Sequence, residues 1–454
     1  MVRASKDEMV LVGFLQAQNC SILTSSWRHP ESSHGFLTPA YYQHIAKTLE
    51  AGKFHLAFFD DRLAMPDTFG SDHSVTVREG IRPVKLDPIP ILALMGAVTK
   101  HLGLGATCST TYYEPFHVAR AFQTLDHMTH GRAAWNVVTS LNHSEAANFG
   151  RDQHLDHDTR YDRADEFVEA VVGHWNSWDD NALILDRERG VFGDPAKIRR
   201  LDYVGRFLKT RGPFTVPRSP QGHPVLIQAG QSGRGNDFAA RWGEVIFAGY
   251  HNIDVARQSY TKVKALVEKR GRDPAQVKIT PSMYVVVGET KTEAEEKLAT
   301  IDSLNRSHDG IVLLSEQLSF DFSKKPFDEP FSDEELKSIN GLHALRDRVL
   351  ARSGKSNPTT HDFIQFAAKS TVRELPLAFG SPKDVADTLE DWFEQRACDG
   401  FVIPATHLPG TYEDFTRLVS PELQRRGLLK RGYSGSTLRS SLGLLQHVNQ
   451  GMRR

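Results

Sequence analysis

Short apolar runs recur along the chain, and most are followed by a segment in which apolar residues return with helical spacing. Runs that are apolar at nearly every position are typical of parallel strands buried on both faces. The pattern predicts eight such strands, at residues 9–15, 54–59, 102–109, 133–139, 224–229, 244–248, 277–287 and 400–404.

The helical segments between these runs have recognisable ends. Thr38 and Pro39 predict an N-cap followed by proline at the first helical position, and Gly52 predicts the end of that helix. Ser381 and Pro382 open another helix in the same way. Eight buried strands that alternate with helices fit a closed (β/α)₈ barrel or a large doubly wound sheet. The strand count favours an α/β fold of the TIM-like barrel type.

Two regions interrupt the alternation and are predicted to be insertions in a single barrel domain that spans residues 1–454. Residues 176–221 are rich in Asp, Arg, Pro and Gly and follow the fourth strand. Residues 301–374 separate the seventh and eighth strands. Long insertions on barrels often form lids over the active site, and others are packing appendages. The sequence leaves both roles open.

Composition excludes several classes of protein. The 454 residues are 39% hydrophobic and 24% charged, which is enough apolar material for an ordinary folded core. A formal net charge of -1 argues against broad capture of nucleic acid or anionic membrane. No apolar run approaches the roughly 18 residues of a membrane span, so we expect a soluble, cytoplasmic protein. Three separated cysteines predict neither a disulfide framework nor a CxxC metal site.

A glycine-rich segment, residues 228–235, follows the fifth predicted strand. Its glycines are spaced GxxGxG, so it does not match the dinucleotide-binding GxGxxG pattern. It is not a nucleophile elbow either, because Arg234 stands where GxSxG requires glycine. Two interpretations remain for Gly230 and Ser232: a phosphate cradle at a strand end, or an ordinary tight turn.

Polar residues also follow the second, third and fourth strands. They are Asp60 and Asp61, the hydroxyl cluster that includes Thr107, and the stretch from Asn136 to Ser140. Barrels bind ligands at this face, and such groups can hydrogen-bond a flat heterocycle and a phosphate. His154 and His157 have HxxH spacing without an obvious third ligand, so the sequence predicts no metal site. No catalytic acid, base or nucleophile stands out.

Residues 131–140, GRAAWNVVTS, resemble the bacterial-luciferase-like flavin monooxygenases, in the group of the nitrilotriacetate and dibenzothiophene sulfone monooxygenases. The resemblance extends over nearly the whole chain and is weakest in residues 301–374. Other matching motifs are Trp27-Arg28-His29-Pro30, Thr124-Leu125-Asp126-His127, His157-Asp158-x-Arg160-Tyr161, Gln228-Ala229-Gly230-x-Ser232 and Pro421-Glu422-Leu423-Gln424-Arg425-Arg426-Gly427.

The resemblance implies a TIM-like barrel that binds reduced FMN and activates dioxygen to oxygenate a small molecule. A separate NAD(P)H:flavin reductase would supply the reduced FMN, and a homo-oligomer is expected. Asp60 departs from the family, whose members usually have a small or apolar residue there. The residues that the resemblance assigns to FMN are Asp61, Thr107, Asn136, Ser140, His157, Tyr161, Gly230 and Ser232.

The substrate is less defined. Residues 41–46 and 102–107 most resemble the sulfone branch, which favours an organosulfur or other apolar heteroatom compound. An aminopolycarboxylate is the competing substrate class, for which Arg28 and Arg62 are the available cations. The sequence also leaves open a non-catalytic flavin-binding protein and, more remotely, a metal-dependent hydrolase. Candidate residues for the substrate pocket are Phe14, Cys20, His29, Phe247 and Phe401.

Overall fold

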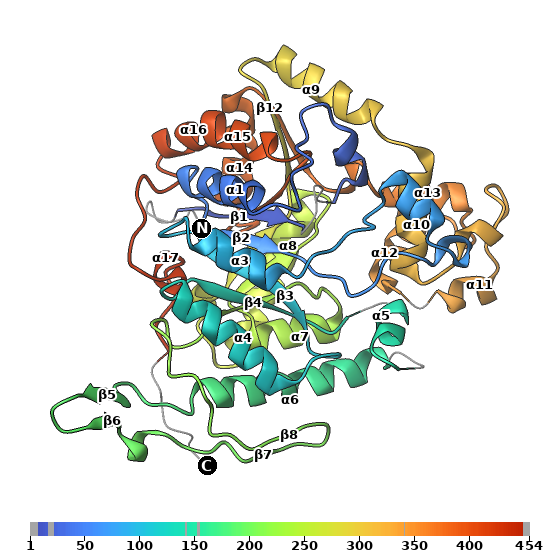
Figure 1. Cartoon of the computed structure of the whole chain (residues 1–454). Helices are drawn as coiled ribbons and strands as arrows, with labels where there is room; N and C mark the ends of the chain where they lie inside the picture. The colour runs from blue at the N-terminus through green and yellow to red at the C-terminus, as the bar shows by residue number, and fades with distance from the viewer. Residues whose placement is uncertain (1–7, 17–21, 141–142, 152–154, 340, 448–454) are drawn as a thin grey trace.

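A computed structural model describes residues 8–16, 22–140, 143–151, 155–339 and 341–447 (Figure 1). Its centre is an eight-stranded sheet in the order β11-β10-β9-β4-β3-β2-β1-β14, and every neighbouring pair is parallel. The strands are β1 (Val10–Leu15), β2 (Leu56–Phe59), β3 (Gly103–Ser109), β4 (Ala133–Val138), β9 (Val225–Gln228), β10 (Val245–Ala248), β11 (Lys278–Pro281) and β14 (Gly400–Pro404).

The two ends of this sheet meet. The Asp399 N–H donates to the carbonyl oxygen of Ile279 over 2.7 Å, and Ser282 forms a parallel bridge with Val402. Strands that follow one another along the chain are neighbours around the sheet, as in a (β/α)₈ barrel. The predicted TIM-like barrel is confirmed, and each of the eight predicted strands contributes to it.

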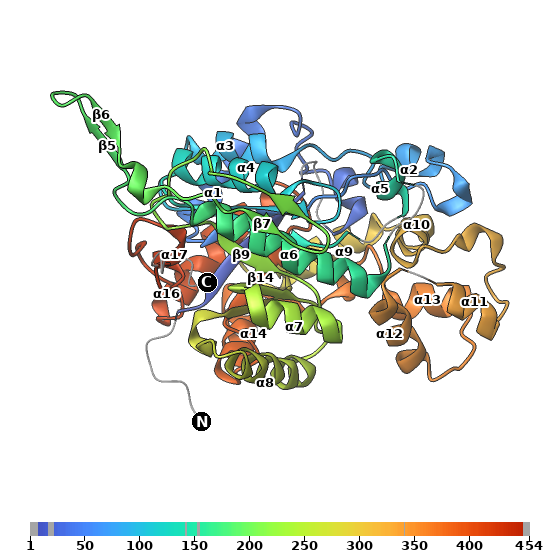
Figure 2. The same cartoon turned by 90° about the horizontal axis from the view of Figure 1, so that it is seen from below.

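Helices cover the outside of the barrel (Figures 1 and 2). Local sequence explains where they begin. At the start of α14, Ser381 Oγ accepts from the Asp384 N–H, and the Asp384 carboxylate accepts from the Ser381 N–H in return. The helices of this layer are α1 (Pro39–Ala51), α3 (Pro88–Gly96), α4 (Pro115–Met128), α6 (His157–Trp175), α7 (Gly233–Trp242), α8 (Ile253–Lys269) and α14 (Pro382–Glu394). Shorter or peripheral helices are α2 (Ser74–Glu79), α5 (His143–Asn148), α9 (Lys291–Ser303), α15 (Gly410–Asp414), α16 (Ser420–Arg425) and α17 (Leu438–Ser441).

The seventh predicted strand is two strands in the structure. β11 ends at Pro281, and the chain then leaves the barrel as β12 (Tyr284–Val287). β12 pairs in parallel with β13 (Leu377–Gly380), a strand that the sequence analysis missed. Both halves of residues 277–287 are buried and apolar, so hydrophobicity alone does not reveal the break between them.

The two irregular regions differ in structure. Residues 176–221 contain two antiparallel hairpins, and the first projects from the body of the molecule (Figure 2). The hairpins are β5 (Leu183–Asp186) with β6 (Val191–Gly193), and β7 (Tyr203–Val204) with β8 (Lys209–Thr210). Residues 301–374 form mainly helices, namely α10 (Ser307–Leu318), α11 (Asp333–Ser338), α12 (His343–Ser353) and α13 (Thr360–Ala367).

The helices α10 to α13 share a hydrophobic core of their own. Phe322, Phe331 and Phe363 lie at its centre with ring centroids 5.1 to 5.8 Å apart. Ile81, from the connection between β2 and α3, completes this core. The second insertion therefore packs as a lobe against the loop that follows β2. Within the described ranges, every helix is too short or too polar to cross a lipid bilayer.

Candidate functional site

Polar side chains lie toward the carboxyl ends of β3, β4 and β9. Thr107 and Asn136 are register partners, and the Asn136 amide donates to Thr107 Oγ1 over 2.8 Å. Asn136 Oδ1 and, on β9, Gln228 Oε1 are buried without a hydrogen-bond partner in the described part of the chain. An unpaired buried acceptor costs roughly 1–3 kcal/mol. Asn136 shares the inward side of its strand with Ala134, whereas Gln228 alternates with the inward-facing Ile227 and lies on the helix side, next to Gly230. The unpaired acceptor inside the barrel, Asn136 Oδ1, indicates a bound molecule that carries N–H or O–H donors.

Ser140, just beyond β4, has a strained backbone. Its φ is 54°, in the left-handed region that residues other than glycine seldom adopt. Its Oγ lies 2.8 Å from Ser109 Oγ at the end of β3, and Ser109 Oγ also accepts from the Thr111 N–H over 3.1 Å. Strain that neighbouring hydrogen bonds hold in place is typical of functional sites. Ser140 and Ser109 therefore extend the polar rim formed by Thr107 and Asn136.

The glycine-rich segment forms a turn at the N-terminus of the ten-residue helix α7. Ser232 is the N-cap, and its Oγ accepts from the Gly235 N–H over 3.0 Å. A Cβ on Gly230 would lie 2.5 Å from Tyr161 Oη, so only glycine leaves room for the tyrosine there. His157 Nε2 lies 3.4 Å from Ser232 Oγ. Hydroxyls, an imidazole and free N–H groups at a helix N-terminus together form a cradle suited to an anion.

Burial raises the pKa of Tyr161, while its hydrogen bond with Ser232 and the charges of Arg160 and Arg234 act in the opposite direction. The phenol therefore remains protonated at neutral pH and can donate a hydrogen bond. Arg234 lies 5.6 Å from the centre of the Tyr161 ring, but its charge is balanced by ion pairs with Asp162 (3.1 Å) and Asp165 (2.6 Å).

The adjacent carboxylates after β2 have different surroundings. Asp60 Oδ1 lies 2.8 Å from Lys85 Nζ, and Asp60 Oδ2 accepts from the Gln16 amide over 2.9 Å. Burial raises the pKa of Asp61 to about 7, although the charge of Lys85 and a hydrogen bond from the Arg62 N–H lower it. Lys85 thus balances the charge of Asp60, and the Gln16 amide holds its side chain in place. Asp61, in contrast, is a carboxyl group that changes charge near neutral pH.

Aromatic residues line the inside of the barrel below this rim. The ring of Phe58 lies 5.5 Å from that of Phe14 and 4.7 Å from that of Phe247, between centroids. All three belong to the apolar cluster that fills the barrel. Phe401 faces the other way: it is fully buried against Trp392 of α14, in the layer between barrel and helices. The prediction that Phe401 forms part of the pocket wall is therefore wrong.

Arg28 and Arg62 are both engaged by α10 of the insertion. Arg28 forms an ion pair with Asp309, and Arg62 Nη1 lies 3.2 Å from Glu316 Oε1. Burial raises the pKa of both carboxyl groups, while the guanidinium charges act to lower it. The loops that carry the two arginines are thereby fixed to α10, and neither guanidinium is left without a carboxylate partner.

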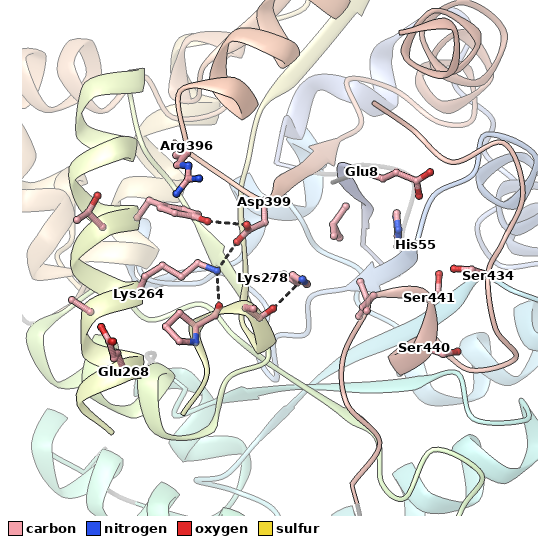
Figure 3. Close-up of a pocket in the computed structure, with 18 residues that line it drawn as sticks. Glu8, His55, Lys264, Glu268, Lys278, Arg396, Asp399, Ser434, Ser440 and Ser441 are labelled. Carbon is pink, nitrogen blue, oxygen red and sulfur yellow. Dashed lines mark hydrogen bonds and ion pairs between the residues drawn. The ribbon is translucent and has the colours of Figure 1, made fainter. Parts of the chain in front are cut away.

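A separate cavity of about 760 Å³ lies at the amino-terminal end of the barrel, where Figure 3 shows its lining. Two of its lysines are engaged within the lining: Lys264 Nζ lies 3.0 Å from Asp399 Oδ2, and Lys278 Nζ donates to the Ala275 carbonyl over 3.0 Å. Barrel enzymes work at the opposite, carboxyl-terminal face. This cavity contains none of the residues predicted to bind FMN, and we assign it no catalytic role.

Comparison with known proteins is consistent across sequence and structure. The sequence pattern of the family described as luciferase-like monooxygenase matches residues 19–399. The chain belongs to this family. Its fold, in turn, resembles a solved structure of riboflavin lyase with modified FMN and riboflavin, with a TM-score of 0.87, 31% identity and coverage of 97% of this chain and 96% of the other.

Two curated relatives are similar over almost their full length. Dibenzothiophene-sulfone monooxygenase of Rhodococcus erythropolis is 46% identical over 96% of this chain and 97% of its own. Nitrilotriacetate monooxygenase component A of Aminobacter aminovorans is 38% identical, with the same coverage. As a luciferase-like monooxygenase, the chain is an enzyme, and the family depends on flavin.

The structure places most of the residues that the resemblance assigned to FMN in two groups. Thr107, Asn136 and Ser140 form one group at the strand ends, while His157, Tyr161, Gly230 and Ser232 form the cradle at α7. Cys20 lies outside the described residues. Sequence reasoning did not single out Gln228, which lies next to Gly230, or Phe58, which is part of the aromatic wall. A polar residue at the end of a buried strand was the signal available for Gln228.

Proposed function

We propose that the chain is the oxygenase component of a two-component system that uses reduced FMN and dioxygen to oxygenate a small apolar substrate with a heteroatom, in the organosulfur class. Two observations carry the flavin assignment: the unpartnered buried acceptor Asn136 Oδ1 inside the barrel, and the anion cradle at α7, where Gln228 lies next to Gly230. The ring of FMN has N–H donors for the unpaired acceptor, and its phosphate is an anion that suits the cradle.

Each group has a role in this proposal. Ser232, Tyr161 and His157 hold the FMN phosphate, and Gly230 provides the space in which Tyr161 and the phosphate meet. At the strand ends, Asn136, Thr107, Ser140 and Asp61 contact the ring or the ribityl chain, while Gln228 supports the cradle next to Gly230. Bound reduced FMN supplies the electrons for reaction with dioxygen. The chain itself orients flavin and substrate and excludes water, which requires no strong nucleophile.

The proposed substrate class rests on charge. A polycarboxylate needs several cationic or amide donors directed at it. Arg28 and Arg62 are already paired with Asp309 and Glu316 of α10. The wall formed by Phe14, Phe58 and Phe247 is apolar instead. The sulfone monooxygenase relative is also more similar in sequence than the nitrilotriacetate relative, at 46% against 38% identity.

A product-resolved screen tests this class. Purified chain receives enzymatically reduced FMN, dioxygen and, separately, aryl sulfones, thioethers, alkanes and aminopolycarboxylates. We expect turnover of the sulfones or thioethers and little product from the aminopolycarboxylates. Turnover restricted to aminopolycarboxylates would refute the apolar class and leave the oxygenase intact. Tight binding of reduced FMN without any product across the panel would favour a flavin-binding protein without oxygenase activity.

We further propose that residues 1–454 form one barrel domain with insertions at 176–221 and 301–374, and that the chain is a homo-oligomer. The projecting β5–β6 hairpin supports the second point. Isolated two-stranded ribbons are marginal in water, yet Leu185 and Phe192 on this one are 57% and 70% exposed. A second copy of the chain would cover them. Light scattering should give a multiple of the 50.9 kDa chain mass, and a monomer would refute the proposal.

A further inference from the structure

Two histidines and a glutamate meet where the segment after η1 (Thr24–Arg28) packs against the carboxyl end of β14. The imidazole rings of His29 and His407 are nearly parallel, 10° apart, with centroids separated by 3.8 Å. Glu31 Oε2 lies 3.4 Å from His407 Nε2. One potential ligand atom from each residue lies within 4.8 Å of the other two. We propose that His29, Glu31 and His407 bind one transition-metal ion of the zinc class.

His407 Nε2 is buried and faces the Glu31 carboxylate at 3.4 Å. The side chain is 7% exposed, and the nitrogen makes no hydrogen bond within the part of the chain that the structure describes. A Cβ on Gly410 would lie 2.2 Å from this nitrogen. Glycine at position 410 therefore keeps space beside Nε2 that any other residue would fill.

The other nitrogen of His407 is supported as in metal-binding histidines. Nδ1 lies 3.3 Å from Thr406 Oγ1, which lies 2.9 Å from Thr411 Oγ1. Thr411 Oγ1 also accepts from the His407 N–H over 3.2 Å. In metal sites a hydrogen bond at the far nitrogen fixes the orientation of the ring, and such partners strengthen binding. The two threonines give His407 this support.

The charges also suit a cation. Burial lowers the pKa of His29 and lowers that of His407 to about 3, with smaller effects from neighbouring charges, so both rings are neutral, as ligands must be. Lys297 is the cation that contributes to the shift at His407, and its own charge is balanced by Asp414 at 2.6 Å and Glu293 at 3.0 Å. Glu31 adds a carboxylate, and because its side chain is 69% exposed, this edge of the site is open to solvent.

Two imidazoles and one carboxylate are a ligand set of zinc sites that keep a fourth position open. A metal lies in the plane of each imidazole that binds it, so the two rings must turn out of their stack on binding. We assign this movement to His29, which the described chain holds by one hydrogen bond, from the Glu31 N–H to His29 Nδ1 over 3.2 Å. The sequence predicted no metal site because positions 29 and 407 lie far apart along the chain and form no motif.

Titration of the full-length, metal-free chain with Co²⁺, followed by displacement with Zn²⁺, tests the proposal. We expect visible ligand-field bands that saturate at one equivalent per chain and disappear with Zn²⁺. Glu31→Gln, at an exposed position, should weaken Co²⁺ binding by about tenfold or more, and His407→Ala should remove the bands. The matched control is Glu413→Gln, which alters another exposed carboxylate paired with a histidine, His44, at 2.6 Å and should change nothing.

Absence of a saturable one-equivalent site in the unaltered chain would overturn the proposal. Equal binding by the Glu31→Gln and Glu413→Gln variants would overturn it as well, because it would place the metal at other surface histidines. Since the readout is metal binding without flavin or substrate, neither result depends on the proposed oxygenase function.

Discussion

At the scale of single residues, Ser232 has two roles that an experiment must separate. Its hydroxyl caps α7 by accepting from the Gly235 N–H, and it faces the proposed phosphate position beside His157. Replacement by alanine would remove both interactions at once. Aspartate keeps the cap, since it is among the preferred N-cap residues, and places a negative charge beside the phosphate.

We therefore predict that Ser232→Asp weakens FMN binding by about tenfold or more and leaves riboflavin, which has no phosphate, nearly unchanged. Fluorescence titration of the two flavins measures the difference. Asn252→Asp is the matched control, because Asn252 caps α8 by accepting from the Val255 N–H over 2.9 Å. Equal losses for FMN and riboflavin would remove Ser232 from the phosphate site.

Asp61 gives a prediction of pH dependence. Burial raises its pKa from 3.8 to about 7 in the folded chain. A folded state that holds the proton more tightly is favoured at low pH, so this contribution to stability is lost as the pH rises from about 4 to about 7. The Tm of the flavin-free chain should fall relative to that of Asp61→Asn over this interval and stay parallel above it. Parallel curves throughout would show that Asp61 titrates normally.

The sequence was sufficient to place Thr107, Asn136 and Ser232 at one end of the barrel, because parallel strands end at a common face. It was insufficient for Phe401. A strand buried on both faces is apolar at every position, so the sequence does not show which residues point into the barrel. Pairing with β1 sets Phe401 beside Leu11 on the outer side, and its neighbour Val402 faces inward.

At the scale of elements, α17 closes the amino-terminal end of the barrel. Leu438 and Leu442 join the apolar cluster inside it, and Arg439, 2% exposed, forms an ion pair with Glu244 just before β10. Although burial raises the pKa of Glu244, the charges of Arg439 and His447 hold it well below the ordinary value. A helix of four residues is thus fixed by an ion pair whose partner is 195 positions away.

We predict that Arg439→Met lowers the free energy of unfolding by about 3–5 kcal/mol, because it leaves the Glu244 carboxylate buried without its cation. Denaturant titration measures this loss. Adding Glu244→Gln should restore part of it by removing the buried charge. Arg425→Met is the control, since Arg425 is 70% exposed beside Glu422 and its loss should cost less than about 1 kcal/mol. A similar small cost at Arg439 would contradict a structural role for the pair.

Element ends were predicted well where the signal is local and poorly where pairing decides. Pro39 and Ser381 lie at the starts of α1 and α14 as expected, because capping depends on neighbouring residues. The separation of β12 from β11 depends on β13, almost a hundred residues later, whose four residues are too few to give a periodic pattern. Likewise, the ion pairs that join α10 to the rest of the barrel involve Arg28 and Arg62, which were predicted only as available cations.

At the scale of the whole molecule, the chain combines the proposed phosphate cradle at α7 with a sequence that lacks the dinucleotide-binding GxGxxG pattern. Residues 228–235 are the segment most similar to such a fingerprint, and their GxxGxG spacing forms the cap of α7 rather than a dinucleotide loop. A monooxygenase built in this way needs reducing equivalents from elsewhere. In the proposed two-component system, we expect reduced FMN to diffuse from whichever enzyme reduces it to this chain.

The purified chain should therefore oxidise NADH very slowly when it is given oxidised FMN, dioxygen and substrate. Addition of an unrelated NAD(P)H:flavin reductase should restore product formation. Photoreduced FMN should support a single turnover without any reductase. Dialysis membranes that separate the two proteins but pass FMN provide the control for free diffusion. Efficient NADH oxidation by the isolated chain would contradict the two-component assignment. If product forms only when one particular reductase can touch the chain, reduced FMN is transferred directly and does not diffuse freely.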